Sequence, residues 1–278
     1  MDLEPTQENI SEAFGFQVPP SLAMLVGLAR RLRPEEPHRA LEAIGIELGG
    51  PLFGFLGGQP TSMREPHTPP ELFPFLYQPA WQLHIGYVVD EPETACGDEF
   101  MLAGLSVEAP EKCGMLARNL PELLSALVHD AGEAAETVAT TLCADFELGD
   151  CGGLDKARAA AKKERDACSS YCTDDRIGVR VPEEPAPLEL LHVEFRRHLI
   201  GTRERDRVLD AGRRALKIGA PGAALALARD LIWTLGERTH WYQIALELME
   251  EVYPALHRPL LARVARREWA RHYGRRKS

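Results

Sequence analysis

The sequence predicts an α+β protein in which a small antiparallel sheet is flanked by helices and followed by an all-helical C-terminal region. Two observations lead to this prediction. Apolar residues recur at helical three- and four-residue steps along most of the chain, but residues 79–93, PAWQLHIGYVVDEPE, alternate with period two. A stretch rich in proline and acid at 179–187, VRVPEEPAP, then precedes a segment with helical periodicity alone.

The predicted sheet depends on two neighbouring extended segments. In the first, one side of the alternating pattern is apolar and consists of Leu83, Ile85, Tyr87 and Val89. This alternation is typical of a half-buried strand. The second segment is EFMLAGLSVEAPE at 99–111, which follows after a short loop. Because the connection is short, we expect the two strands to pair in antiparallel fashion.

Helices are predicted on both sides of these strands. The prolines and serine at 19–21 favour a helix start, and the following apolar pattern continues to about Leu32. A second helix is predicted from Pro34 to Ile46. Residues 120–142 carry one apolar stripe that Gly132 may divide into two helices, and residues 154–172 are rich in strong helix formers.

These patterns predict three regions along the chain. Residues 1–130 form an α+β domain, residues 131–178 form a helical extension, and residues 186–278 form a C-terminal helical bundle or cap. In the last region, we expect three helices, each with one apolar face. The first face contains Leu227, Leu231 and Leu235, and the second contains Ile244, Leu248 and Val252. The third contains Leu261, Ala265, Trp269 and Tyr273.

Composition is that of a folded protein in a reducing compartment. The chain has 278 residues, and no apolar run approaches the roughly 20 residues that a membrane span needs. Its first residues, MDLEPTQENI, lack the basic start and apolar core of a secretory signal, so we expect a cytoplasmic location. Six cysteines are too sparse for a disulfide framework, and we expect most of them to be thiols.

Charge is distributed unevenly. The net charge of −10 combines 18 basic and 11 acidic residues from Ala186 onward with 14 basic and 31 acidic residues before it. The balances are therefore +7 and −17. The acidic part repels nucleic acid and suits a basic protein partner, so nucleic acid is not an expected ligand.

Enzyme signatures are missing from the sequence. It has no HExxH, GxSxG, GxxxxGK[ST], GxGxxG or CxxC motif, so we expect a protein that is not an enzyme and has no cofactor.

His129-Asp130 resembles the start of a metal-dependent phosphohydrolase site, but no matching histidines and aspartates accompany it, and a solvated helix face is the alternative. Weak zinc ligand candidates are Cys143, Cys151, Cys168 and Cys172. Only the last two are as close as in the usual ligand pairs.

The end of the alternating segment is the candidate partner-binding site. Asp90, Glu91 and Glu93 could bind a cation, receive a basic partner or merely solubilise a hairpin loop. Aromatic residues beside charge are favoured at interfaces, and this segment also contains Trp81, His84 and Tyr87. These six residues are the predicted recognition surface.

Four segments in the first 130 residues follow one another in an order that can be compared with known families: FGFQVPPSLAMLVGLA, TPPELFPF, HIGYVVDEPE and ARNLPELLSALV. This order resembles the SUKH superfamily, in which a helix after Leu/Val-Pro-Pro opens the domain, a Pro-Phe turn leads into central antiparallel strands, and a Leu-Leu helix closes it. The corresponding positions here are Val18-Pro19, Pro74-Phe75, Gly86 to Asp90 and Asn119 to Leu127. The chain departs from the family in its reduced GGPLFGFLGG segment and in the region from about 131 onward.

The resemblance implies an α+β domain that binds protein. Bacterial members are largely immunity proteins that neutralise toxins, often nucleases, by tight binding. The expected function is therefore that of a cytoplasmic immunity protein that occludes a toxin, for example a basic nuclease. The alternatives are a regulatory or scaffold protein that binds a cellular partner and, third, a metal-dependent enzyme that uses His129, Asp130 or the cysteines.

Overall fold

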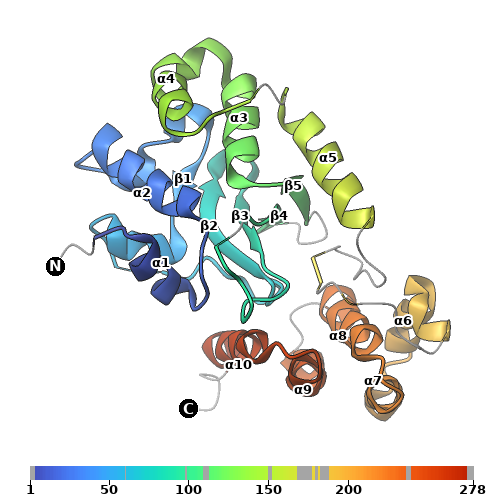
Figure 1. Cartoon of the computed structure of the whole chain (residues 1–278). Coiled ribbons are helices and arrows are strands. Elements are labelled where there is room, and N and C mark those ends of the chain that lie inside the picture. The colour runs from blue at the N-terminus through green and yellow to red at the C-terminus, as the bar shows by residue number, and fades with distance from the viewer. Residues whose placement is uncertain are drawn as a thin grey trace. The chain divides into compact units, whose positions relative to one another are not determined.

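The computed structural model describes residues 4–59, 61–97, 99–108, 113–149, 152–167, 177–178, 181, 188–235 and 239–273. The chain forms two compact units (Figure 1). The sheet unit comprises Met1–Met63, Leu72–Val89 and Thr94–Ala167. The helical unit comprises Arg64–Glu71, Asp90–Glu93 and Cys168–Ser278. The predicted α+β class with an all-helical C-terminal region is confirmed.

The sheet has five antiparallel strands among the described residues, and each pairs with the next along the chain. They are β1 (Glu47–Leu48), β2 (Leu72–Gln78), β3 (Leu83–Val88), β4 (Leu102–Ser106) and β5 (Gly114–Ala117). The two predicted strands are β3 and β4, and their antiparallel pairing is confirmed.

β3 is buried on both faces, in contrast to the half-buried strand that the alternation predicts. Ile85 and Tyr87 are 1% and 0% exposed, and Val88 on the opposite face is 4% exposed. The reason is its central place in the sheet, between β2 and β4. Burial of the phenol raises the pKa of Tyr87 well above its ordinary value.

Pro74 and Phe75 lie inside β2, so the turn that the family pattern implies at this dipeptide is wrong. The pairing register with β3 shifts between Pro74 and Leu76. Proline has no backbone N–H to donate and is tolerated in a strand where the ladder is interrupted in this way. The continuous apolar run LFPFLYQ is therefore a strand that is buried along nearly its whole length.

Helices α1 (Gln7–Phe14), α2 (Pro20–Leu32), α3 (Leu120–Ala131), α4 (Glu136–Asp145) and α5 (Leu154–Ala167) complete the sheet unit. The start of α2 agrees with the predicted one. Gly132 has a positive φ of 57° and ends α3, and a short 3-10 turn, η6 (Gly132–Ala135), leads into α4, so the predicted division is confirmed. α5 packs beside β5 at the edge of the sheet (Figure 1).

The helix predicted from Pro34 to Ile46 is wrong. This segment contains only two 3-10 turns, η1 (Pro37–Arg39) and η2 (Glu42–Ile44). Glu36 has φ −140° and ψ 62°, which is not helical, because the ring of Pro37 disfavours the α conformation in the residue before it. Gly45 then takes a positive φ of 78° and turns the chain toward β1.

The helical unit contains η7 (Leu188–Leu191), α6 (Val193–Gly201), α7 (Arg205–Lys217), α8 (Pro221–Leu235), α9 (Thr239–Ala255) and α10 (Pro259–Tyr273). Consecutive helices from α7 to α10 pack on one another. Their buried residues include those of the predicted apolar faces, namely Leu227, Leu231, Ile244, Leu248, Val252, Leu261 and Ala265. None of the described helices combines the length and apolar character needed to cross a membrane.

The last change from the sheet unit to the helical unit falls between Ala167 and Cys168, and two earlier segments, Arg64–Glu71 and Asp90–Glu93, also belong to the helical unit. α4 and α5, which the sequence suggested as a separate helical extension, belong to the sheet unit. Most of the 179–187 linker-like stretch lies outside the described residues.

Candidate functional site

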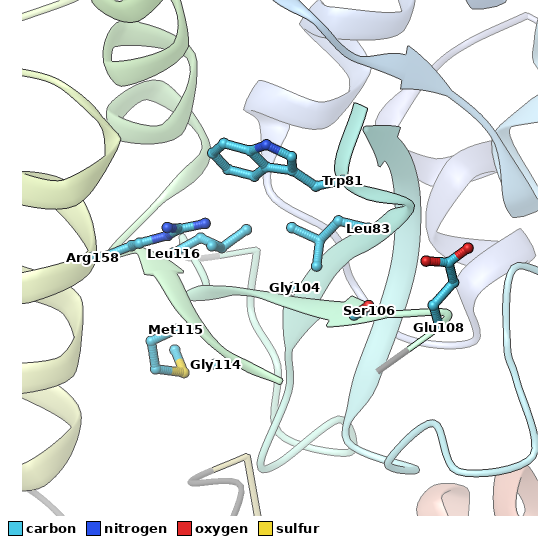
Figure 2. A pocket seen from close by; sticks show the side chains of 9 residues that line it. All are labelled: Trp81, Leu83, Gly104, Ser106, Glu108, Gly114, Met115, Leu116 and Arg158. Carbon is cyan, nitrogen blue, oxygen red and sulfur yellow. The ribbon is translucent and has the colours of Figure 1, made fainter. Parts of the chain in front are cut away.

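A hollow of about 510 Å³ lies at one end of the β3–β4–β5 face of the sheet unit (Figure 2). It is lined by Trp81, Leu83, Gly104, Ser106, Glu108, Gly114, Met115, Leu116 and Arg158. Gly104 and Gly114 are directly opposite each other in β4 and β5. Because neither has a side chain, the side-chain layer on this part of the sheet is incomplete, and glycines in strands often mark such a site of close approach.

The two glycines play different roles. A Cβ on Gly104 would come within 2.7 Å of Leu83 Cδ2 and 3.0 Å of Leu116 Cδ1, so these two leucines cover it and form an apolar floor. A Cβ on Gly114 would meet nothing within 4 Å. Gly114 therefore borders the open volume of the hollow.

One wall is formed by Trp81 and Arg158, which come from distant parts of the sequence (Figure 2). Trp81 ends the 3-10 turn η4 (Pro79–Trp81) between β2 and β3, and Gln82 reverses the chain with a left-handed φ of 46°. The indole is 53% exposed. The Arg158 guanidinium from α5 lies 5.2 Å from the indole centroid, which is a cation–π distance.

A carboxylate contributes to another part of the lining. Gln82 Nε2 donates a hydrogen bond of 2.7 Å to Glu108 Oε1. The Val107 backbone N–H donates to the Gln82 carbonyl at 2.9 Å, which fixes the segment that carries Glu108. The hollow thus combines an apolar floor, an exposed aromatic ring with a cation on it, and an anion that already accepts a hydrogen bond. These groups suit recognition of a ligand of mixed polarity.

The six residues of the predicted recognition surface are divided between the two units. Trp81 lines the hollow. His84 is half-buried, with its ring 5.5 Å from that of Tyr77. Tyr87 is fully buried, with its ring 4.7 Å from that of Phe75, and serves the core of the sheet unit.

The three acidic residues of that surface belong to the helical unit, where they hold the start of α10. Arg258 donates from Nε to the Asp90 carbonyl at 2.8 Å and forms an ion pair with the Glu91 carboxylate. The Leu260 backbone N–H donates to Glu93 Oε1 at 2.6 Å. A carboxylate near a helix N-terminus satisfies a backbone donor and complements the helix dipole. These contacts give a structural role to the carboxylates of Glu91 and Glu93 and to the backbone of Asp90.

The segment Arg64–Glu71 also belongs to the helical unit. The Tyr253 hydroxyl donates to Glu71 Oε1 at 2.8 Å, and Arg64 Nη2 donates to the Pro69 carbonyl at 2.6 Å. Burial of the guanidinium lowers the pKa of Arg64. Burial, followed by the Glu71 carboxylate, raises the pKa of Tyr253 well above its ordinary value.

His129 and Asp130 lie at the end of α3, and the carboxylate has a structural partner. The Leu154 backbone N–H, at the start of α5, donates to Asp130 Oδ2 at 2.9 Å. His129 Nδ1 lies 3.2 Å from Asp130 Oδ1. The dipeptide is therefore explained by attachment of α5, and no group of three metal-ligating side chains occurs in the part of the chain that the structure describes.

We expect Asp130→Ala to destabilise the protein by about 1 kcal/mol, because the N-terminus of α5 loses a side-chain acceptor. His129→Ala, which removes an exposed ring, should change the free energy of unfolding by less than about 0.5 kcal/mol. Chemical denaturation of both variants measures this difference. Equal effects of the two substitutions would contradict the capping role of Asp130.

The predicted zinc ligands fall mostly outside the described residues. Cys143 is exposed on α4, whereas Cys151, Cys168 and Cys172 are not described. Zinc binding by these cysteines therefore stays a prediction.

Sequence reasoning selected Trp81 but missed Arg158, Glu108 and Gly114. One signal was available for the site: Gly104 interrupts a predicted strand, and an interior strand glycine often marks close approach by another group. Nothing local in the sequence connects Arg158 with Trp81, because the contact depends on how α5 packs beside β5.

Comparison of the chain with protein-family models and with curated proteins finds no match. What the structure defines is a class: an α+β protein with a five-stranded antiparallel sheet, an all-helical C-terminal region and a solvent-accessible hollow on its sheet unit.

Proposed function

We propose that this chain is a non-catalytic protein-binding protein and that the hollow beside Trp81 is its recognition site. The observation that carries the proposal is the large exposed indole at the edge of an apolar-floored hollow, with the Arg158 guanidinium 5.2 Å from the centre of the ring. Tryptophan and arginine are enriched among the residues that dominate protein–protein affinity, especially where a pocket receives the partner. An exposed tryptophan beside such a hollow therefore favours a binding surface.

The partner class follows from the resemblance to the SUKH superfamily. We infer a bacterial immunity protein that acts in the cytoplasm and neutralises a toxin, for example a nuclease, by covering part of its surface. The order of a helix from Pro20, antiparallel strands and a helix from Leu120 is compatible with that pattern. The balance of −17 over residues 1–185 favours a partner with a basic surface, because complementary charge speeds encounter.

Co-expression with the toxin-like product of a neighbouring gene tests this proposal. The expected result is a complex that survives purification and protects the host cells from the toxin. Neither a complex nor protection would contradict the immunity function. Recovery of a cellular housekeeping protein through the same hollow would instead support a regulatory or scaffold protein.

Trp81→Ala should weaken the complex by at least about 2 kcal/mol, roughly thirtyfold in Kd, because the variant removes the exposed aromatic anchor. Met24→Ala is the matched control, since Met24 is a 44% exposed apolar residue of the same unit that does not line the hollow. Titration calorimetry with the purified partner measures both affinities. Equal affinities for the two variants would contradict a role of Trp81 in recognition.

A further inference from the structure

The charge of Arg158 is only weakly matched within the described structure. Its one ion pair there joins Nη1 to Asp155 Oδ1 at 3.7 Å, and the Asp155 side chain is fully exposed. Ion pairs of this kind contribute little because water screens them. Arg158 also makes a cation–π contact with the Trp81 ring, with its Cζ 5.2 Å from the ring centroid.

We propose that the hollow recognises an acidic side chain, aspartate or glutamate, of a polypeptide partner, with the carboxylate bound by Arg158 and an adjoining apolar side chain resting on the floor. This inference rests on the proposed protein-binding function and specifies the chemistry of the partner at the same site. A guanidinium offers a planar pair of N–H donors that matches a carboxylate, and the cation–π contact with Trp81 keeps the Arg158 guanidinium beside the hollow before the partner arrives.

The two charged groups of the lining, Arg158 and Glu108, lie on opposite sides of the hollow in Figure 2. Glu108, the carboxylate in the lining, already accepts a hydrogen bond from Gln82. Lys162 follows Arg158 by four residues on α5, so the two cations share a helix face, and Lys162 is exposed. Arg158 is the cation of the lining, and Lys162 adds a second positive charge on the same helix.

The floor defines the second part of the ligand. Leu83 and Leu116 cover Gly104, and the space above Gly114 is open. A volume of about 510 Å³ is within the range of pockets that hold a ligand of several functional groups. It therefore has room for an apolar side chain beside the carboxylate.

This arrangement gives a rule for specificity. The N-terminal 185 residues carry a balance of −17, so a basic partner is attracted to the surface in many orientations. Arg158 is a local exception to that charge. A partner must place its own acidic residue against Arg158, and this requirement selects one orientation and rejects partners without that residue.

Selection from a displayed library of random 12-residue peptides on the purified full chain tests the inference. The wild type should select peptides that carry Asp or Glu at a fixed position beside an apolar residue. Arg158→Gln should select peptides without this acidic preference. Gly114→Val should select no peptides above background, because its side chain projects into the hollow from a point where an added Cβ meets nothing within 4 Å, and its unfolding temperature should match that of the wild type.

A titration then gives the size of the effect. Changing the selected acid to its amide in a synthetic peptide should weaken binding to the wild type by about tenfold or more, and should leave binding to Arg158→Gln unchanged. An acidic preference that persists in Arg158→Gln, or selection of lysine- and arginine-rich peptides, would overturn the inference while leaving hollow-dependent binding intact. Peptides that bind Gly114→Val as well as the wild type would instead contradict the hollow as the binding site.

Discussion

Gly86→Ala is expected to destabilise the protein by about 3 kcal/mol, enough to threaten folding of the sheet unit. A Cβ at this position in β3 would lie 2.2 Å from the Phe73 carbonyl oxygen and 2.5 Å from Pro74 Cα. Both are backbone atoms of the paired strand β2, so no side-chain rotation relieves the contact. The strands would have to separate where the register already shifts beside Pro74.

Gly114→Ala is the matched control for this prediction. Gly114 is also a strand glycine of the same sheet, but its added Cβ meets nothing within 4 Å. We expect its free energy of unfolding to stay within about 0.5 kcal/mol of the wild type. Circular dichroism during urea denaturation measures both variants. If Gly86→Ala were as stable as Gly114→Ala, the close approach of β2 to β3 would be incorrect.

Asp230→Ala should cost about 3–5 kcal/mol, because it leaves a buried arginine without its counter-ion. Arg196 Nε lies 2.6 Å from Asp230 Oδ2, and the two side chains are 2% and 1% exposed. Arg196 Nη1 also donates to the Leu190 carbonyl at 2.6 Å, so the guanidinium is held in place and has no route to water. The loss should appear as unfolding of the helical unit at lower denaturant concentration.

Two comparison variants test whether the cost of Asp230→Ala comes from the burial of the Arg196–Asp230 pair. Glu204→Ala breaks an ion pair with Arg207 in the same unit, but both side chains are more than half exposed, and we expect a change of less than about 1 kcal/mol. The double change Arg196→Met with Asp230→Leu should recover most of the loss, because it removes both buried charges. A single Asp230→Ala variant with wild-type stability would contradict the energetic role of the pair.

Residue periodicity was sufficient to place two elements, although it did not predict that β3 is buried on both faces. The alternation at 83–89 and the helical pattern at 20–32 correspond to β3 and α2. β2 was missed because its continuous apolar run, with Pro74 inside it, lacks the alternation of a half-buried strand. The helix predicted at 34–46 does not form because the ring of Pro37 disfavours the α conformation at Glu36.

The site was less predictable than the fold because it depends on contacts between distant residues. Trp81 could be selected by residue type and position. The neighbouring acids Asp90, Glu91 and Glu93 are close to it in sequence, yet they serve the helical unit, where two of them are bound by Arg258 and one by the start of α10. Arg158, which lies on Trp81, carries no local signal that distinguishes it from the other cations of α5.

The most direct test of the central claim is the affinity of the full chain for the partner that the co-expression experiment recovers, measured by titration calorimetry for the wild type and for Gly114→Val. We predict a stable complex with the wild type and no measurable complex with a Gly114→Val protein that unfolds at the same temperature as the wild type. Equal affinity of the two proteins would contradict the hollow beside Trp81 as the surface through which this protein binds its partner.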